Sequence, residues 1–431
     1  MKRLPFFLLP FLLLYGSLLH CESIESKVKT ILVTYKDRIL TRAPIATLSG
    51  SYRPSHAYTS STWSRNLAKK LAEQYQLKIQ FAWPIDTIGV QCVVYEISDH
   101  RSVADVLKSM GDNKRIESVQ SMVTYDVYSN NASASFAHAP SPLGRPASSF
   151  ADIHRWTTGK GILIALIDTG VDINHPDLQG QILSTHNLID HFSESFADDL
   201  HGTAVAGVIS ARADNNLGAI GIAPGAKLVA LKACWPQQAG QFQASCNSLS
   251  LVMAINRAIS LNVDIINLSL SGEPDPLVSR MINEAIARGI VVVAADHDTH
   301  QARQQSFPAS MNAVIAARHL LPTLKTRRPM NHHSVAVQSS NILTTLPQGK
   351  YKRVSSCSIA AAQVSGIVAL LLEVNYDLTP NQIQTLLETA EKYHDTPVTD
   401  EINVHALIAK LRDNHVPVKF MPNLMDNSKL R

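Results

Sequence analysis

The segment GILIALIDTG (residues 161–170) is an apolar run that ends in an aspartate. A continuous apolar run such as Ile162 to Ile167 is typical of a strand buried on both faces of a parallel sheet. Functional side chains of such sheets gather at the carboxyl ends of the strands. Asp168 stands at that end, so we expect its carboxylate to lie in a site where it could orient an imidazole.

Two later segments carry the partners that such an aspartate needs. In DDLHGTAVAGVI (198–209), His201 opens a predicted helix of small apolar residues, and Gly202 allows a close approach of backbone. Ser358 heads SIAAAQVSGIVALLL, a helix whose free N–H groups could stabilise charge on a substrate carbonyl. Each residue alone is an ordinary strand end or helix start. Together they contain the three parts of a charge-assisted nucleophile.

The order Asp168, His201, Ser358 is the order of the subtilisin triad. With these flanking segments, the chain resembles the subtilisin family of serine endopeptidases. The resemblance implies an α/β fold with a mostly parallel sheet covered by helices on both faces. It also implies an acyl-enzyme mechanism in which His201 takes the proton of Ser358 and Asp168 orients the imidazole.

The resemblance also points to the residues that hold the substrate backbone. VDIINLSLSG (263–272) looks like the family's substrate-pairing strand, where the turn is usually S-L-G-G. This chain has Ser269, Leu270, Ser271 and Gly272 at those positions. We therefore expect these four residues to bind an extended peptide.

The oxyanion-binding residue departs from the family. GIVVVAADHDTH (289–300) resembles a strand that runs into A-A-G-N, whose asparagine donates to the oxyanion. Matching without a gap places that asparagine at Asp298, and matching the two alanines places it at His297. A neutral Asp298 could donate the missing hydrogen bond, whereas an ionised one would repel the oxyanion. We prefer Asp298 because it needs no shift.

The segment around the serine departs as well. The family's G-T-S-M-A-A-P appears as Ser356 to Ala362, so a serine replaces the glycine and Cys357 replaces a threonine. A side chain at Ser356 would matter if the backbone there needs unusual angles or if substrate passes close by. Cys357 is expected to be a small packed residue, with use as a nucleophile the alternative.

The N-terminus predicts export. Met-Lys-Arg followed by an apolar run from Leu4 to Leu19 has the charged and apolar regions of a secretory signal. The run is short and interrupted by two prolines, which disfavours a stable membrane span. We expect cleavage near residues 21–23 and a secreted or periplasmic protein. A lipid anchor on Cys21 is the less favoured alternative, because His20 stands where lipoproteins carry a small residue.

A pro-region is predicted between the signal and the catalytic domain. Residues 24–127 read as strand 28–35, helix 63–75, strands 77–83 and 89–97, helix 101–110 and strand 118–125. This is the split βαβ, ferredoxin-like α+β pattern. By the resemblance, such a segment assists folding and inhibits the enzyme. An unrelated small binding domain is the alternative.

The rest of the chain divides into three predicted parts. Residues 128–149 form a linker rich in Ala, Ser and Pro, residues 150–412 a catalytic domain, and residues 413–431 a polar tail. Alternating strands and helices predict the parallel sheet of the catalytic domain. The strands are expected at 162–168, 227–232, 263–269 and 290–295, and the helices near 202–212, 247–261, 277–288, 358–373 and 380–390.

The cysteines, the net charge and the histidines bear on which covalent links, ligands and binding partners to expect. Among five cysteines, Cys234 and Cys246 are the pair expected to form a disulfide in an exported chain. A net charge of +4 without a basic, aromatic-interleaved stripe argues against nucleic-acid binding. RRPMNHH (327–333) is read as a solvated loop rather than a metal site. No cofactor is expected; calcium is common in the family but stays unassigned, because NNLG (215–218) is shorter than the usual calcium loop.

Three functions remain open from the residues alone. The first is a secreted serine endopeptidase made as a zymogen, with its own pro-region as intramolecular inhibitor and protein or peptide as substrate. The second is a catalytically weak or silent homologue that binds extended peptides along the strand near Ser269. A third is activity confined to processing its own pro-region.

Overall fold

The structure is a computed structural model of the chain. It describes residues 29–37, 60–127, 136–137, 150–189, 195–296, 306–320, 334–391 and 403–413. The expected signal peptide, most of the linker, both oxyanion candidates (297 and 298), segment 327–333 and nearly all of the polar tail lie outside the described residues.

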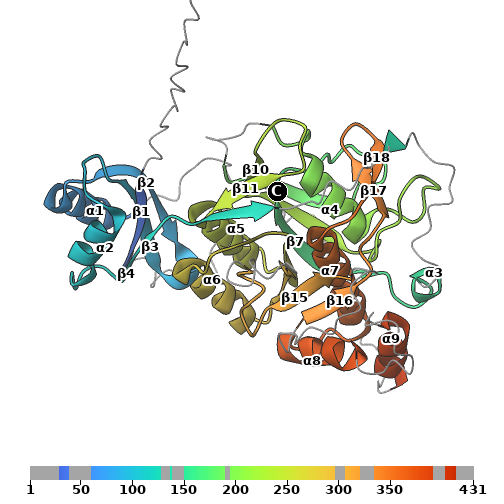
Figure 1. Cartoon of the computed structure of the whole chain (residues 1–431). Helices are drawn as coiled ribbons and strands as arrows, with labels where there is room; N and C mark the ends of the chain where they lie inside the picture. The colour runs from blue at the N-terminus through green and yellow to red at the C-terminus, as the bar shows by residue number, and fades with distance from the viewer. Residues whose placement is uncertain are drawn as a thin grey trace, which may run out of the picture.

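A seven-stranded parallel sheet forms the centre of the larger part of the molecule, in the order β16-β15-β14-β12-β7-β9-β8 (Figure 1). Its apolar runs predict the four central strands. Three outer strands were not predicted, because they are short or expose part of their surface. In chain order the strands are β7 (Leu163–Asp168), β8 (Ile182–Asn187), β9 (Lys227–Lys232), β12 (Ile265–Leu268), β14 (Val291–Asp296), β15 (Ile315–His319) and β16 (Ser334–Val337).

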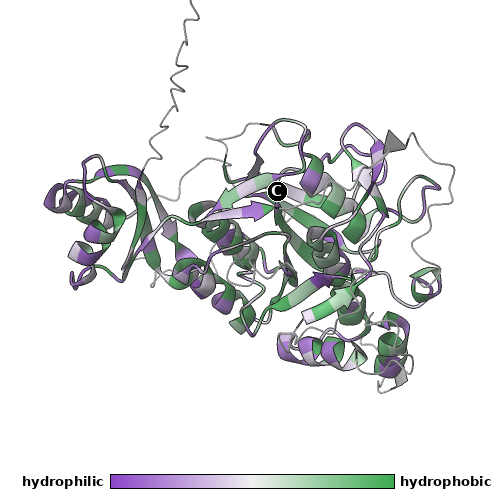
Figure 2. Ribbon diagram, in the orientation of Figure 1, coloured by the Kyte–Doolittle hydropathy of each residue, from purple (hydrophilic) through white to green (hydrophobic). Residues whose placement is uncertain are grey.

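Helices cover both faces of this sheet. On β7, Ile164 and Leu166 pack into one core with α4 (Leu200–Ser210) and α7 (Cys357–Val374). Ala165 and Ile167 point to the other side, where α5 (Ser248–Ser260) and α6 (Pro276–Ala287) pack. The period of two along a strand explains this division. Figure 2 shows the resulting apolar centre. The remaining helices are α3 (Phe150–Ile153), α8 (Pro380–Glu391) and α9 (Val404–Asp413).

Helix α7 carries Ser358 and runs through the core. Among the described residues it is the one helix long and apolar enough to cross a membrane by length and composition. However, 78% of it is buried inside the molecule. Burial by protein accounts for its apolar character, since a core helix is apolar all round.

The N-terminal part is a four-stranded antiparallel sheet in the order β2-β3-β1-β4, with two helices. One face of this sheet packs on α1 and α2, and the other packs against α5 and α6 (Figure 1). The elements are β1 (Thr30–Lys36), α1 (Thr62–Tyr75), β2 (Lys78–Ile85), the short 3₁₀ helix η2 (Asp86–Ile88), β3 (Val90–Glu96), α2 (Val103–Gly111) and β4 (Ser118–Ser121).

The strand expected over residues 118–125 is instead two strands in different sheets. β4 ends at Ser121 and pairs with β1, whereas β5 (Thr124–Val127) crosses to the larger part of the molecule. There it joins the sheet β10-β11-β5-β13. The prediction was wrong because both halves have strand-like composition, and only the pairing partners separate them. The other strands of this sheet are β10 (Cys234–Pro236), β11 (Ala244–Asn247) and β13 (Ser271–Gly272).

A third small sheet lies beside α4. Strands β17 (Ile342–Leu346) and β18 (Lys350–Val354) form a hairpin, and β6 (Phe136–Ala137) pairs antiparallel with the outer edge of β18. Thr344 and Thr345 of β17 donate their hydroxyls to backbone carbonyls of α4. The hairpin is therefore fixed against the helix that carries His201.

Candidate active site

Asp168 and His201 lie together at the carboxyl end of the sheet. His201 Nδ1 is 2.8 Å from Asp168 Oδ1, and both side chains are buried. The backbone N–H of Thr169 donates to the same carboxylate oxygen at 2.7 Å. Gly202 is needed here, because a Cβ at this position would lie 2.5 Å from the carbonyl oxygen of Gly170. The carboxylate is thus placed to hold the imidazole in one orientation.

Ser358 occupies the second position of α7. The N-cap residue is Ser356, whose hydroxyl accepts from the N–H of Ile359 at 3.2 Å. With φ of −171°, Ser356 has an extended backbone that any residue adopts. The departure from glycine therefore imposes no backbone strain, and the added hydroxyl caps the helix. Cys357 is half-buried against the core.

The hydroxyl of Ser358 donates to the carbonyl oxygen of Ser269 at 3.1 Å. His201 Nε2 is buried and has no hydrogen-bond partner among the described residues. In a serine–histidine–aspartate triad, this is the imidazole nitrogen that takes the proton of the serine hydroxyl. Catalytic hydrogen bonds of this kind often form only when substrate is bound.

Of the four residues expected to bind substrate, Ser269 contacts Ser358, Ser271 and Gly272 pair with the chain's own strand β5, and Leu270 is buried in the core. β5 runs antiparallel to β13, with Asp126 opposite Ser271 and Tyr125 opposite Gly272. Its other edge pairs with β11, from Ala244 to Asn247. Residues 124–127 are therefore bound as the central strand between two strands of the larger part. Tyr125 is fully buried against Gly272 and Phe307.

A hairpin beside this strand is closed by a disulfide between Cys234 and Cys246. The two residues face each other across β10 and β11.

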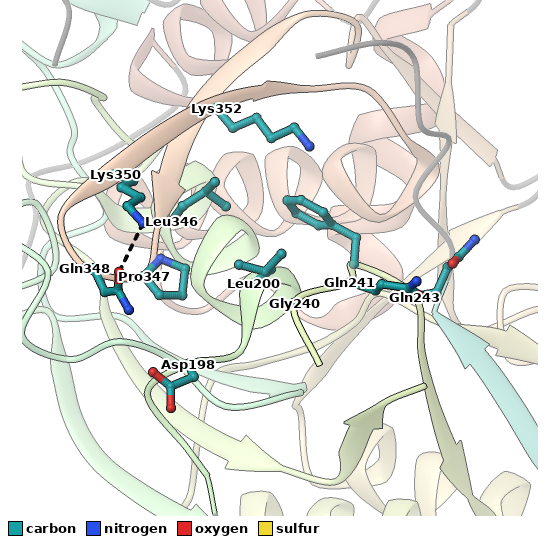
Figure 3. A pocket seen from close by; sticks show the side chains of 11 residues that line it. Asp198, Leu200, Gly240, Gln241, Gln243, Leu346, Pro347, Gln348, Lys350 and Lys352 are labelled. Atoms are coloured by element: carbon teal, nitrogen blue, oxygen red, sulfur yellow. Dashed lines mark hydrogen bonds between the residues drawn. The ribbon is translucent and has the colours of Figure 1, made fainter. Parts of the chain in front are cut away.

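Near the tip of the hairpin lies a pocket of about 520 Å³, between the start of α4 and the β17–β18 turn (Figure 3). Leu200, which precedes His201, lines it together with Phe242 and Lys352. The ammonium of Lys352 lies 4.8 Å from the centre of the Phe242 ring.

The polar groups near NNLG bond to one another. The carboxylate of Asp177 accepts from Asn215 Nδ2 at 2.8 Å and from the N–H of Ala219 at 2.9 Å. Calcium requires six to eight oxygen ligands. Among the described residues there is no group of three or more His, Cys, Asp or Glu side chains placed to hold a metal.

Comparison with known proteins agrees with this geometry. The model of the family described as "Subtilase family" matches residues 159–405, more than half of the chain. The chain belongs to the subtilase family. The predicted subtilisin-like α/β fold and the predicted enzyme class, serine endopeptidase, are therefore confirmed.

Several curated subtilases are similar to this chain. The major intracellular serine protease of Bacillus subtilis is 36% identical over 231 residues, which cover 49% of this chain and 69% of that protein. Subtilisin E of Bacillus subtilis is 31% identical over 244 residues, covering 55% of this chain and 62% of that protein. The solved structure of fervidolysin from Fervidobacterium pennivorans, a keratinolytic enzyme related to subtilisin, shares the fold. Its TM-score is 0.65 at 19% identity, over 89% of this chain and 61% of that one.

Some residues of this subtilase site were not predicted. Lys232, at the end of β9, and Asp199, two residues before His201, form a buried ion pair beside Asp168. The one signal for this ion pair in the sequence was Lys232 itself, a lysine that directly follows the apolar interior of β9. Gln120 was also missed, because its partners come from an element far along the chain.

Proposed function

We propose that this chain is a secreted serine endopeptidase made as a zymogen, and that it cuts its own linker. The observation behind this proposal is that β5 lies as an antiparallel strand between β11 and β13. Main-chain pairing of this kind is how proteins bind extended peptides at a sheet edge. Residues 124–127 thus stand where the backbone of a substrate would bind.

The two described segments that flank residues 128–135 are both paired with strands of the larger part. β5 pairs with β13, which begins two residues after Ser269, and the Ser269 carbonyl accepts from Ser358. Downstream, β6 pairs with Tyr351 and Lys352 of β18, a few residues before Ser358. Residues 128–135 connect these two anchors. This arrangement supports cleavage shortly after Val127, within the segment expected to be an exposed linker.

The N-terminal part is bound as an inhibitor would be. Gln120 donates to Asp275 Oδ1 at 2.8 Å and accepts from the N–H of Leu277 at 3.1 Å. Both bonds are buried at the start of α6. The hydroxyl of Thr87 donates to Asn256 Oδ1 of α5. Arg280 of α6 forms an ion pair with Glu117, with 3.3 Å between Nη1 and Oε1. These polar contacts fix the register of an otherwise apolar interface, and they support residues 24–127 as an intramolecular pro-region.

Export is supported by two features. Residues 1–23 have the composition of a secretory signal, and the disulfide between Cys234 and Cys246 is of the kind that persists in oxidising compartments. A bridge that closes a loop of this size stabilises a protein by roughly 3 kcal/mol. We place the protein outside the cytoplasm, secreted or periplasmic, without a lipid on Cys21.

The proposed chemistry follows from the positions of the side chains. Ser358 turns from the Ser269 carbonyl toward His201, and Nε2 takes its proton as the oxygen attacks the substrate carbonyl. Asp168 accepts from Nδ1 and stabilises the imidazolium that forms. The Ser358 N–H, at the start of α7, and Asp298 (or His297) meet the developing oxyanion. The imidazolium then protonates the leaving amine, and water hydrolyses the acyl-enzyme.

One observation favours a second candidate, a silent homologue that binds peptides. The Ser358 hydroxyl is engaged with Ser269, and the site already holds an extended strand. A chain that never turned its serine would bind peptide along β13 without cutting it.

One experiment separates the two. The full chain is expressed with its own N-terminus, as wild type and as Ser358→Ala, and both are analysed by gel and by N-terminal sequencing. We expect the wild type to yield a new N-terminus within a few residues after Val127, and the variant to stay intact. A fluorophosphonate should label Ser358 in the wild type only. Intact, unlabelled chains in both samples would establish the silent homologue instead.

A further inference from the structure

We infer that the buried pair Lys232–Asp199 is a positioning device for the catalytic dyad, holding the Asp168 turn and the start of the His201 helix on one another. The inference rests on the proposed function, because it assigns a kinetic role to residues that touch no substrate. Neither residue belongs to the triad, and both are almost completely buried.

The pair joins three elements. Lys232 ends β9 and lies directly opposite Asp168 of β7 in the sheet register. Its ammonium donates to Asp199 Oδ2, and the same oxygen accepts from the N–H of Gly170 at 2.8 Å. Asp199 is the N-cap residue of α4, yet its side chain makes no capping bond to that helix. Its carboxylate instead reaches to the turn that follows Asp168.

Gly170 is required for this approach. A Cβ at that position would lie 2.7 Å from Asp199 Oδ2 and 2.0 Å from the carbonyl oxygen of Phe196. The turn is bound to the helix by two further contacts. Thr169 accepts from the N–H of Gly202 at 2.9 Å, and the hydroxyl of Thr203 accepts from the N–H of Asp172 at 3.0 Å. The ion pair is the charged member of this set.

Burying two charged side chains costs free energy, so this pair is poorly explained by a contribution to stability alone. Burial raises the pKa of the Asp199 carboxyl. The Lys232 ammonium and the Gly170 N–H lower this pKa and the charge of Asp168 raises it, each with a smaller effect. Replacing a buried ion pair by neutral side chains of similar size is often neutral or stabilising. A pair kept despite this cost is explained by what it does for its neighbours, Asp168 and His201.

The test uses the double variant Asp199→Asn/Lys232→Met in the full chain, which removes both charges and keeps an acceptor for Gly170. We expect an unchanged or higher melting temperature, an unchanged KM, and a kcat and fluorophosphonate labelling rate lower by roughly tenfold or more, because small misplacements of catalytic groups are amplified in rate. Lys227→Met, at the other end of β9, is the matched control and should label at the wild-type rate.

The single variants add a charge signature. The charged groups around His201 in the described residues include Asp168 on β7, Asp199 beside it on the chain and Lys232 on β9. Lys232→Met leaves an extra negative charge that favours the imidazolium, so the acid limb of the kcat/KM profile should move to higher pH. Asp199→Asn leaves a positive charge and should move it to lower pH, each by roughly half a unit. Opposite shifts would show that both charges of the pair act on His201, and the loss of kcat at unchanged KM in the double variant tests positioning.

The outcomes are distinguishable. A wild-type chain that neither labels nor cleaves would overturn the proposed function and this inference together. A wild type that labels, with a double variant that labels equally fast and single variants with superimposable pH profiles, would overturn the inference and leave the protease intact.

Discussion

At the scale of single residues, catalysis depends on which groups surround Ser358. The carboxylate of Asp168 and the imidazole of His201 are in hydrogen-bond contact and buried, so the base is preorganised. The departure at Ser356 is harmless to the backbone, since its extended conformation suits a serine that caps α7. For Asp298, which lies outside the described residues, we propose the position of the family's neutral amide donor; its charge would then set the strength of the oxyanion site.

Asp298→Asn tests that charge. If a neutral Asp298 donates to the oxyanion, wild-type activity should rise as the pH falls toward mild acidity, until protonation of His201 stops it. The asparagine variant should lack this rise and, at neutral pH, turn over on the order of 10²–10³ faster, the size of one oxyanion donor. The measurement is kcat against pH for both chains. Superimposable profiles would exclude a role for the acid form of Asp298.

At the scale of elements, close packing of α4 on β17 holds the histidine helix in place. Gly207 of α4 faces the hydroxyls of Thr344 and Thr345, which donate to α4 carbonyls at 2.6 and 2.7 Å. A Cβ at Gly207 would lie 2.2 Å from Thr345 Oγ1. Neither threonine can move away without losing its hydrogen bond.

We therefore expect Gly207→Ala to destabilise the protein by about 1–3 kcal/mol, although alanine favours a helix. Gly111→Ala is the matched control, because Gly111 also lies in a helix, α2, and no atom lies within 4 Å of its added Cβ. That change should be neutral or stabilising by up to about 1 kcal/mol. Urea unfolding of both variants in the Ser358→Ala background measures the difference, and equal effects would contradict the packing argument.

The sequence predicts elements better than it predicts their partners. Apolar runs identify the central strands and α7, because burial on both sides leaves few polar positions. Edge strands such as β8 are half exposed and lack that signal. β5 has strand composition, but its place between β11 and β13 depends on pairings with residues more than a hundred positions away. The buried partner of Lys232 is likewise set by the tertiary fold, which brings β9 beside the start of α4.

At the scale of the whole molecule, the N-terminal sheet needs a partner for its second face. Residues alternate along β3, so that Val93 and Tyr95 pack on α1 and α2, while Cys92 and Val94 pack toward α5 and α6. Separating the two parts would expose that second face to water. Exposure of this interface would therefore report whether the proposed pro-region is bound.

Cys92 provides the reporter. Its thiol is 1% exposed, and burial, with a smaller effect from the charge of Asp275, raises its pKa to about 12. The thiolate is the reactive form, so iodoacetamide should leave Cys92 unmodified in the intact Ser358→Ala chain. In processed wild type, dilution should release the N-terminal part and expose the Cys92 thiol, whose pKa then returns to an ordinary value. Iodoacetamide should then label Cys92, and mass spectrometry of the Cys92 peptide measures the labelling.

In the Ser358→Ala background, Gln120→Ala should speed the labelling of Cys92, because it removes the buried bonds to Asp275 and Leu277. Rapid labelling of Cys92 in the intact Ser358→Ala chain itself would mean that the two parts do not stay together, and residues 24–127 could not then act as a bound inhibitor.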